Sequence, residues 1–334
     1  MILRPMRTLA FLLLLMFFLH SCFEDESPVP PHEQGDLEEG QAALGPTYGN
    51  QVYFDLSDNE VVASNILSDW DLSFSGETGG WTIRLNSSRF MLAGNSMDTI
   101  FSGNLDPEQL DMRFDTSDGN PDSTAIGTWY EPSGDSIRSL RYVYLIDLGT
   151  DDQGEAIGFK KVSFDLAGND ILLRMANPDS SMDTIVHVRL DPQALSTYYS
   201  FQNGVRDNVP EPGTWSLLFS RYTTMLVTDE GDDYPYLVVG ALLNPNGVQA
   251  ALDTIHDFMD IGIGDIAELE FTSRADIIGY EWKEYDFDAG VYTIVPGLSY
   301  VIRDRDGFYY KLRFVDFYSD EGIKGYPTFE YVRL

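Results

Sequence analysis

The chain has 334 residues, with 54 acidic and 21 basic side chains and a formal net charge of −33 at pH 7. This excess of negative charge argues against binding to nucleic acid or to an anionic membrane through a basic patch. At 43% hydrophobic and 13% aromatic residues, the chain can fill the cores of one or two domains.

The N-terminal residues have the features of a secretory signal. Two arginines precede an uncharged apolar run, residues 9–19, which is too short to cross a bilayer as a helix. The run ends in Leu-His-Ser-Cys, which resembles a bacterial lipobox. The resemblance implies a signal peptide of residues 1–21 and lipidation of Cys22. A plain secretory signal with a chance cysteine is the alternative, although Cys22 is the only cysteine in the chain.

The segment behind Cys22 is acidic and polar. Residues 23–26 read Phe-Glu-Asp-Glu, which resembles the surface-export signal of Bacteroidetes lipoproteins. We therefore expect a lipid-anchored protein on the outer membrane that faces the extracellular side. Residues 22–46 are rich in Pro, Glu, Gly and Gln, a composition typical of a flexible tether.

The rest of the chain has the pattern of an all-β protein. Apolar and polar residues alternate in short runs such as 81–86 and 310–314, and alternation with period two indicates strands. Turn residues such as Asn246-Gly247 separate the runs. Short helical turns are expected only at residues 106–110 and 248–252. The predicted fold is therefore a set of antiparallel β-sheets with few short helices.

Three short motifs occur twice, in the same order. They are W-x-L-x-F at residues 70–74 and 215–219, Y-[LV]-I at residues 144–146 and 300–302, and K-x-x-F at residues 161–164 and 311–314. Such motifs also recur by chance in β proteins. The shared order nevertheless favours two related β units, residues 47–190 and 191–334, packed together or in tandem.

The C-terminal segment resembles a known family. Residues 300–318 form a strand, a D-x-D-G-type turn at 304–307 and a K-L-x-F strand, and residues 324–331 follow with a Lys-Gly step and a final T-F-x-Y strand. Together with W-D-L at 70–72, R-L-N at 84–86 and the lipobox, this pattern resembles the HmuY family, haem-binding surface lipoproteins of Bacteroidetes. The chain is then an enlarged member. The resemblance implies haem capture for an outer-membrane transporter, here of the TonB-dependent class.

The resemblance also implies an axial pair of His or Met for the haem iron. The region of the first ligand contains His256 and Met259. Counting back from residues 300–303 places the second ligand near Asp286, a poor haem ligand, with Tyr285 beside it. His256, Met259 and Tyr285 are therefore the predicted haem-site residues. Their structural alternatives are a hydrogen-bonded surface histidine, a core methionine and a packing tyrosine. Two residues three apart on one strand cannot form a facing pair.

The sequence contains none of the common catalytic motifs, G-x-S-x-G, H-E-x-x-H or a phosphate loop. Its two histidines beyond the tether, His187 and His256, are too few for a zinc site, so we expect neither an enzyme nor a metal site. Carboxylate pairs for glycoside hydrolysis stay open, because their spacing in space is invisible in the sequence. The alternative function is a haem-free structural or interaction lipoprotein: a transporter partner, or a glycan-binding surface using Trp81, Trp129 and Trp282.

Overall fold

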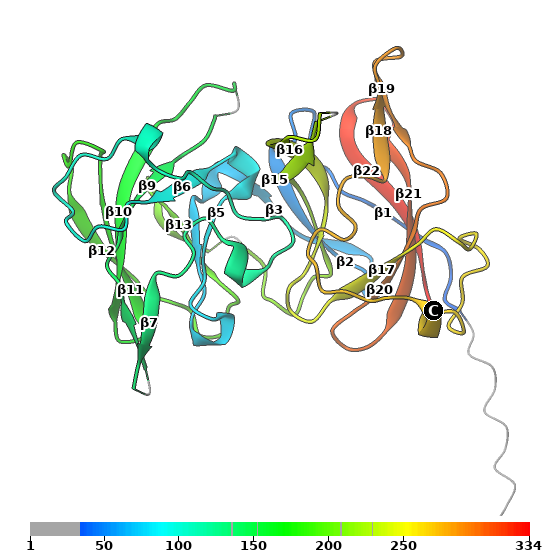
Figure 1. The fold of residues 1–334 in the computed structure, drawn as a ribbon. Helices are drawn as coiled ribbons and strands as arrows, with labels where there is room; N and C mark the ends of the chain where they lie inside the picture. The colour runs from blue at the N-terminus through cyan, green and yellow to red at the C-terminus, as the bar shows by residue number, and fades with distance from the viewer. Residues whose placement is uncertain (1–33, 135, 152, 208, 229) are drawn as a thin grey trace, which may run out of the picture. The chain divides into compact units, whose positions relative to one another are not determined.

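The computed structural model describes residues 34–334 apart from 135, 152, 208 and 229, and this part of the chain is all-β (Figure 1). The strands are β1 (Glu38–Gln41), β2 (Asn50–Asp55), β3 (Glu60–Ile66), β4 (Leu72–Phe74), β5 (Ile83–Leu85), β6 (Leu92–Asn95), β7 (Tyr130–Ser133), β8 (Ser136–Ser139), β9 (Val143–Asp147), β10 (Phe159–Ala167), β11 (Asp170–Ala176), β12 (Thr184–Val188), β13 (Thr197–Ser200), β14 (Gly204–Arg206), β15 (Leu217–Val227), β16 (Asp233–Leu243), β17 (Gln249–Asp253), β18 (Lys283–Asp286), β19 (Val291–Ile294), β20 (Ser299–Arg303), β21 (Tyr309–Tyr318) and β22 (Lys324–Arg333). The helices of the described residues are 3-10 turns at Leu67–Asp69, Glu77–Gly79, Ser87–Arg89, Pro107–Gln109, Pro121–Ser123 and Ile266–Glu268. The predicted fold class is confirmed.

The sheets occur in two matching sets. The two five-stranded sheets have the orders β12-β11-β10-β9-β6 and β1-β22-β21-β20-β17, and the two four-stranded sheets have the orders β14-β13-β4-β5 and β3-β2-β15-β16. All pairs are antiparallel. Each set makes one unit: the first β unit comprises residues 67–206, and the second comprises residues 212–334 together with 34–66. The hairpins β7-β8 and β18-β19 are additions to this common plan.

The strand registers match between the units as the repeated motifs predict. In the first unit Leu72 pairs with Leu85, and in the second Leu217 pairs with Leu243. The same agreement holds in the five-stranded sheets. The pair Leu145 and Lys161 of the first unit corresponds to Val301 and Lys311 of the second, and the pair Tyr144 and Val162 corresponds to Tyr300 and Leu312. The two related β units of the predicted fold are therefore confirmed strand by strand.

The boundaries of the units differ from the predicted division into residues 47–190 and 191–334. Strand β2 pairs with β15, and β1 pairs with β22, so the N-terminal strands complete the second unit. They occupy the places that β12, β13 and β14 occupy in the first unit. The second unit is thus built from both ends of the described chain. A contiguous division could not represent this pairing.

The predicted tether, residues 22–46, is too long. Residues 38–41 form the edge strand β1, and beyond it Ala42 and Leu44 are fully buried. Gly40 lies where a side chain has no room, because a Cβ there would stand 2.5 Å from Cζ of Phe329. An edge strand exposes most of its side chains to water, which explains the polar composition of this segment. The predicted signal peptide, residues 1–21, Cys22 and the remainder of the tether to residue 33 lie outside the described residues.

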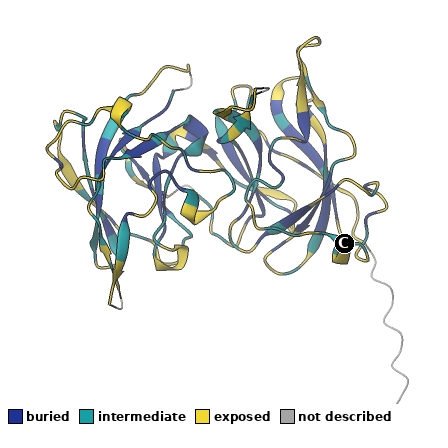
Figure 2. Cartoon of the chain, in the orientation of Figure 1, coloured by how far each residue is buried: buried dark blue, intermediate teal, exposed yellow. Residues whose placement is uncertain are grey.

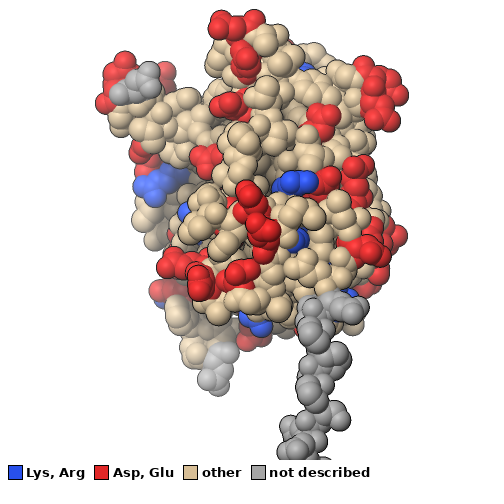
Figure 3. All heavy atoms as spheres, turned by 90° about the vertical axis from the view of Figure 1, so that its right-hand side faces the viewer, with Lys and Arg blue, Asp and Glu red and all other residues tan. Residues whose placement is uncertain are grey.

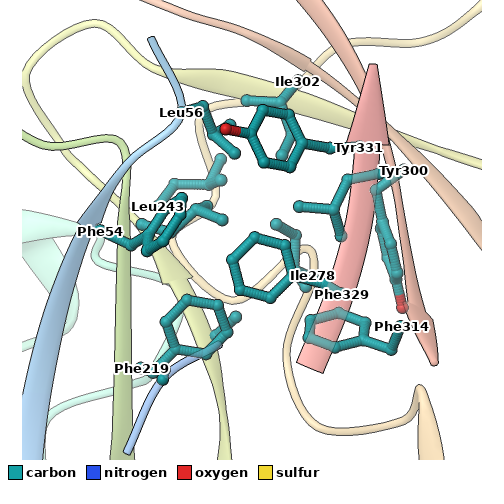
Figure 4. Close-up of a cluster of buried hydrophobic side chains, with 14 of the residues drawn as sticks. Phe54, Leu56, Phe219, Leu243, Ile278, Tyr300, Ile302, Phe314, Phe329 and Tyr331 are labelled. Carbon is teal, nitrogen blue, oxygen red and sulfur yellow. The ribbon is translucent and has the colours of Figure 1, made fainter. Parts of the chain in front are cut away.

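Each unit has its own hydrophobic core, and the cores form the buried centres of the two sets of sheets in Figure 2. In the second unit, Phe219 stacks on Phe329 with ring centres 5.2 Å apart (Figure 4). Trp282 stacks on Phe314 in the same core at 3.9 Å. Trp129 is buried in the core of the first unit. Trp129 and Trp282 are therefore core residues, and neither ring can serve as the exposed stacking platform for sugars that the glycan-binding alternative requires.

The two units contact each other through hydrogen bonds. Arg221 Nε donates to the carbonyl of Ser88 at 2.8 Å, and Thr223 Oγ1 donates to the carbonyl of Ser87 at 2.6 Å. Residues 34–334 accordingly form one compact body. Because these donors are buried or half-buried, losing the contact would leave them without partners at a cost in free energy.

The two predicted helical turns have different outcomes. Pro107–Gln109 forms a 3-10 turn, with Asp106 accepting a hydrogen bond from the backbone N–H of Glu108 at 3.1 Å. The segment 248–252 is instead largely strand β17, paired with β20. Ala250 and Ala251 are both buried there. In a strand, adjacent side chains point to opposite faces, so both faces of β17 are buried here. This packing overrides the helical preference of the two alanines.

The surface is strongly acidic. Separate clusters of Asp and Glu are spread over the face in Figure 3, and Lys and Arg appear there only in small patches. Helical segments long and apolar enough to span a bilayer do not occur in the described part of the chain.

Candidate functional site

The loop that follows β17 holds His256 in a defined orientation. Asp253, the last residue of β17, is buried, and its Oδ1 accepts the backbone N–H groups of Ile255 at 2.8 Å and His256 at 3.1 Å. Its Oδ2 lies 2.8 Å from Nδ1 of the His256 ring. One carboxylate therefore fixes both the backbone turn and the imidazole.

This contact determines the chemistry of the imidazole. Burial opposes ionisation of Asp253, but hydrogen bonds from the His256 ring and two backbone N–H groups hold its pKa below the ordinary value. The same hydrogen bond and the negative charge of Asp253 raise the pKa of His256. With its Nδ1 proton directed at Asp253, the neutral ring presents the lone pair of Nε2 outward. Metal-binding histidines commonly have this arrangement, with the second ring nitrogen bonded to a carboxylate.

Lys311, on β21, holds the same loop through hydrogen bonds to its carbonyl groups. Its Nζ donates to the carbonyl of Ile261 at 2.9 Å and to that of Met259 at 3.2 Å. The ammonium also lies 5.1 Å from the ring centre of Phe258. Burial lowers the pKa of Lys311, and the carbonyls and the ring compensate the buried charge. The His256 loop is therefore supported along its length.

Two apolar side chains of the His256 loop are exposed on the surface. Ile255 is 87% exposed and Met259 is 64% exposed. The interpretation of Met259 as core filler is therefore wrong. Residues 254–260 form a loop and not a strand, so the alternation argument against a His256 and Met259 pair does not apply to them. His256 is hydrogen-bonded through its ring to Asp253, which agrees with the structural alternative stated for it.

The third predicted residue, Tyr285, lies in the β18-β19 hairpin. Its ring contacts Phe287 and Tyr292, with centres 5.1 and 5.0 Å apart. Asp286 ends the strand and accepts the backbone N–H groups of the following turn, at 2.9 Å each. Asp286 is thus a turn residue. Among the described residues, no hydrogen bond, ion pair or ring contact joins this hairpin to His256, so Tyr285 and His256 are not brought together.

The second histidine of the described chain differs from the first. His187 lies on β12, and it is Nε2 that meets Asp170, at 2.9 Å. Within residues 34–334, apart from the four positions that the structure does not describe, no group of three or more His, Cys, Asp or Glu side chains is placed to hold a metal ion.

Two supporting residues escaped the sequence reasoning. Asp253 stands three residues before His256, a spacing at which an aspartate can cap a turn, and this signal could have identified it. Lys311 belongs to a motif that was recognised through the repeat and the family resemblance, but its contact with the loop was not, because this contact joins residues 50 apart.

The architecture thus defines an all-β protein of two related units, with a supported histidine loop on the second. Residues 265–331, which include β18 to β21 and most of β22, match the family model described as HmuY protein. The resemblance to the HmuY family that the sequence indicated is therefore confirmed for this segment.

Solved structures give matches of low identity. Apo PinO from Porphyromonas gingivitis is 10% identical, with 89% of this chain and 96% of that chain covered and a TM-score of 0.28. The apo HmuY analog TFO from Tannerella forsythia is 8% identical, with coverages of 90% and 98% and a TM-score of 0.32. A candidate HmuY-like haem-binding protein from Bacteroides vulgatus is 17% identical, with coverages of 40% and 82% and a TM-score of 0.18. A comparison with curated proteins yields no match.

Proposed function

We propose that this protein is a non-enzymatic binding lipoprotein of the cell surface and that it captures haem through His256. The observation that carries the proposal is the His256 loop, in which Asp253 holds Nδ1 and leaves Nε2 without a hydrogen-bond partner among the described residues. The imidazole therefore fits the role of an axial ligand to haem iron. A bound haem would supply its iron for redox chemistry and ligand binding. Ile255 and Met259 offer apolar contact to a macrocycle.

The cellular location of the protein is part of the same proposal. Cys22 would carry the lipid that holds the protein to the outer membrane, and the acidic residues behind it favour the extracellular face. A TonB-dependent transporter is the partner to which a surface protein of this kind would deliver haem. The HmuY-family match of residues 265–331 supports this role, because the matched segment belongs to the unit that bears His256.

Hemin titration of the soluble chain, residues 23–334, tests the haem proposal. We expect a shifted Soret band that saturates at one equivalent, and we expect His256→Ala to abolish it. His187→Ala is the matched control, because it removes a histidine that also meets an aspartate. A His256→Ala variant with the spectrum of the unmodified chain would refute ligation by His256, and a spectrum identical to that of free hemin would refute haem binding.

The β18-β19 hairpin favours a second candidate, an interaction lipoprotein that binds no haem. Phe287 at its turn is 89% exposed, and Tyr285 beside it is exposed as well. Exposed aromatic side chains of this kind are typical of protein–protein contact sites. A TonB-dependent transporter that co-purifies with the unmodified chain but not with Phe287→Ser would support this role. Equal recovery with both chains would contradict it.

A further inference from the structure

A cavity of about 680 Å³ opens between the four-stranded sheets of the two units. Its volume lies within the range of small-molecule sites. None of the described residues that line it is His, Met or Cys. Its tyrosines are poor iron ligands as well, since burial raises the pKa of Tyr198 to about 12 and that of Tyr53 well above 10. The cavity is therefore distinct from the proposed haem site.

The floor of this cleft consists of two equivalent aromatic pairs. Trp70 meets Tyr198 with ring centres 4.9 Å apart at 80°, and Trp215 meets Tyr53 at 5.0 Å and 80°. Trp70 Nε1 also donates to Oε1 of Gln51 at 3.1 Å, a contact from the first unit to the second. The repeat thus places a rigid aromatic base where the two units meet.

The two walls above this base are equivalent in backbone but opposite in polarity. Ser73 and Arg84 are paired neighbours on the wall formed by β4 and β5. At the matching register of β15 and β16 the paired neighbours are Leu218 and Leu242. A ligand in the cleft would therefore meet polar groups on one side and aliphatic groups on the other.

The charge of the cleft differs from that of the chain. Its lining contains four arginines and four carboxylates: Arg84, Arg189, Arg206 and Arg221, and Asp115, Asp191, Asp207 and Glu211. The whole chain, in contrast, has 54 acidic and 21 basic residues. The cleft is therefore enriched in positive charge relative to the rest of the molecule.

Two of these arginines are available to an anion. Arg84 donates to the carbonyl of Gly119, and within the described residues neither Arg84 nor Arg189 forms an ion pair. One carboxylate of the lining, Asp115, accepts backbone N–H groups with both oxygens, from Leu85 at 2.7 Å and from Ala125 at 2.8 Å. Its burial raises its pKa to about 6. Asp115 therefore does not neutralise the arginines by direct contact.

We infer that this cleft binds an amphipathic organic anion, with an apolar body against Leu218 and Leu242 and a carboxylate against Arg84 and Arg189. Arg206 belongs to the same lining; its guanidinium lies 3.9 Å from Asp69, and its Nε is buried without a hydrogen-bond partner in the described structure. Guanidinium groups bind carboxylates through paired hydrogen bonds, and the aliphatic wall favours a body that loses apolar surface to water. The aromatic floor and the uncharged hydroxyls of the lining complete the site.

Two probes that differ only in charge test this inference. cis-Parinaric acid and its methyl ester become fluorescent when an apolar site takes them up, and only the acid carries a carboxylate. We expect residues 23–334 to bind the acid about tenfold or more tightly than the ester. The double variant Arg84→Gln and Arg189→Gln should lose this preference, whereas Leu242→Ser should weaken binding of both probes.

The controls separate the cleft from other sites. Arg138→Gln removes an arginine on the β7-β8 hairpin, outside the cleft, and should leave both probes unaffected. Energy transfer from tryptophan to the bound acid should decrease in the double variant Trp70→Phe and Trp215→Phe, a readout that does not require the arginine variants to fold. Equal binding of acid and ester, unchanged binding in the arginine variant, or binding of neither probe would overturn the inference.

Discussion

Substituting Gly40 by alanine tests whether the N-terminal segment is part of the second core. A Cβ at this position would lie 2.5 Å from Cζ of Phe329 and 2.8 Å from Cζ of Phe54. Carbon atoms in ordinary contact are about 3.5–4.0 Å apart, so the rings would have to move by about 1 Å. Phe329 has little freedom to do so, because it stacks on Phe219 at 5.2 Å and is fully buried.

The expected cost of Gly40→Ala follows from this crowding. Overpacking a well-filled core by one methyl group typically lowers the free energy of unfolding by about 1–3 kcal/mol. In a protein of this size that corresponds to a decrease in Tm of roughly 2–5 °C. Thermal unfolding followed by circular dichroism, with urea unfolding as the second measurement, would provide both values.

Gly35→Ala is the matched control on the same segment. A Cβ there would stand 3.4 Å from the nearest atoms of Arg333, a contact that a small adjustment relieves. We expect a change within about 0.5 kcal/mol. If Gly40→Ala unfolds at the same temperature as Gly35→Ala, residues 34–46 are not packed on β22 in solution, and the segment is the flexible tether that its composition indicates.

Three further predictions follow from the same contacts. A chain that begins at residue 47 lacks β1, so β22 becomes an open edge; we expect aggregation in size-exclusion chromatography, and a monomer of unchanged Tm would refute this. Burial lowers the pKa of Lys283 to about 7, so between pH 7 and 10.5 the unfolded chain binds a proton that the folded chain does not. The free energy of unfolding therefore rises with pH in that window, by up to about 1.4 kcal/mol per pH unit. Urea unfolding should show this rise in the unmodified chain, and the rise should be absent in Lys283→Met. Trp70→Phe should cost about 1–2 kcal/mol in the same assay, because it leaves Gln51 without its donor, whereas Trp215→Phe removes a buried Nε1 that has no partner and should cost less; equal losses would contradict the assignment.

The sequence predicts the parts of the fold that depend on local pattern. Strand periodicity identified residues that face the cores, Ile83 and Leu85 in the first unit and Leu312 and Phe314 in the second, because a strand must alternate if one face is buried. The lysines Lys161 and Lys311 were found through a repeated motif, and they occupy equivalent registers on β10 and β21. These agreements come from short segments in which neighbouring residues carry the information.

Long-range pairing could not be predicted in the same manner. Strand β1 pairs with β22 almost at the other end of the chain, and nothing in the polar residues 38–41 specifies that partner. The contiguous division of the units failed for this reason. The cleft is a similar case, because strands of both units contribute single outward-facing residues to it, and no local run of sequence contains them together.

The candidate haem site was predicted only in part. His256 was identified through the family resemblance, but its partner Asp253 was not, and the predicted Tyr285 lies on a separate hairpin. The positions of Met259 and Tyr285 depend on how two loops fold over the sheet. Loop paths are set by contacts such as the one between Lys311 and the carbonyl of Ile261, which a sequence pattern does not reveal.

Comparing the two units locates the residues that the shared fold does not require. The ammonium of Lys161 lies 5.0 Å from the ring of Phe101, and that of Lys311 lies 5.1 Å from the ring of Phe258, so both units keep the same anchor under the loop. Two residues before the phenylalanine, however, the first unit has Thr99 where the second has His256. Since the first unit folds on the same plan without this histidine, the scaffold does not need it. A side chain that the scaffold does not need, held by a buried carboxylate with one nitrogen left unbound, fits the role of a ligand-binding residue. If the proposed haem binding occurs through His256, it is therefore expected in the second unit alone.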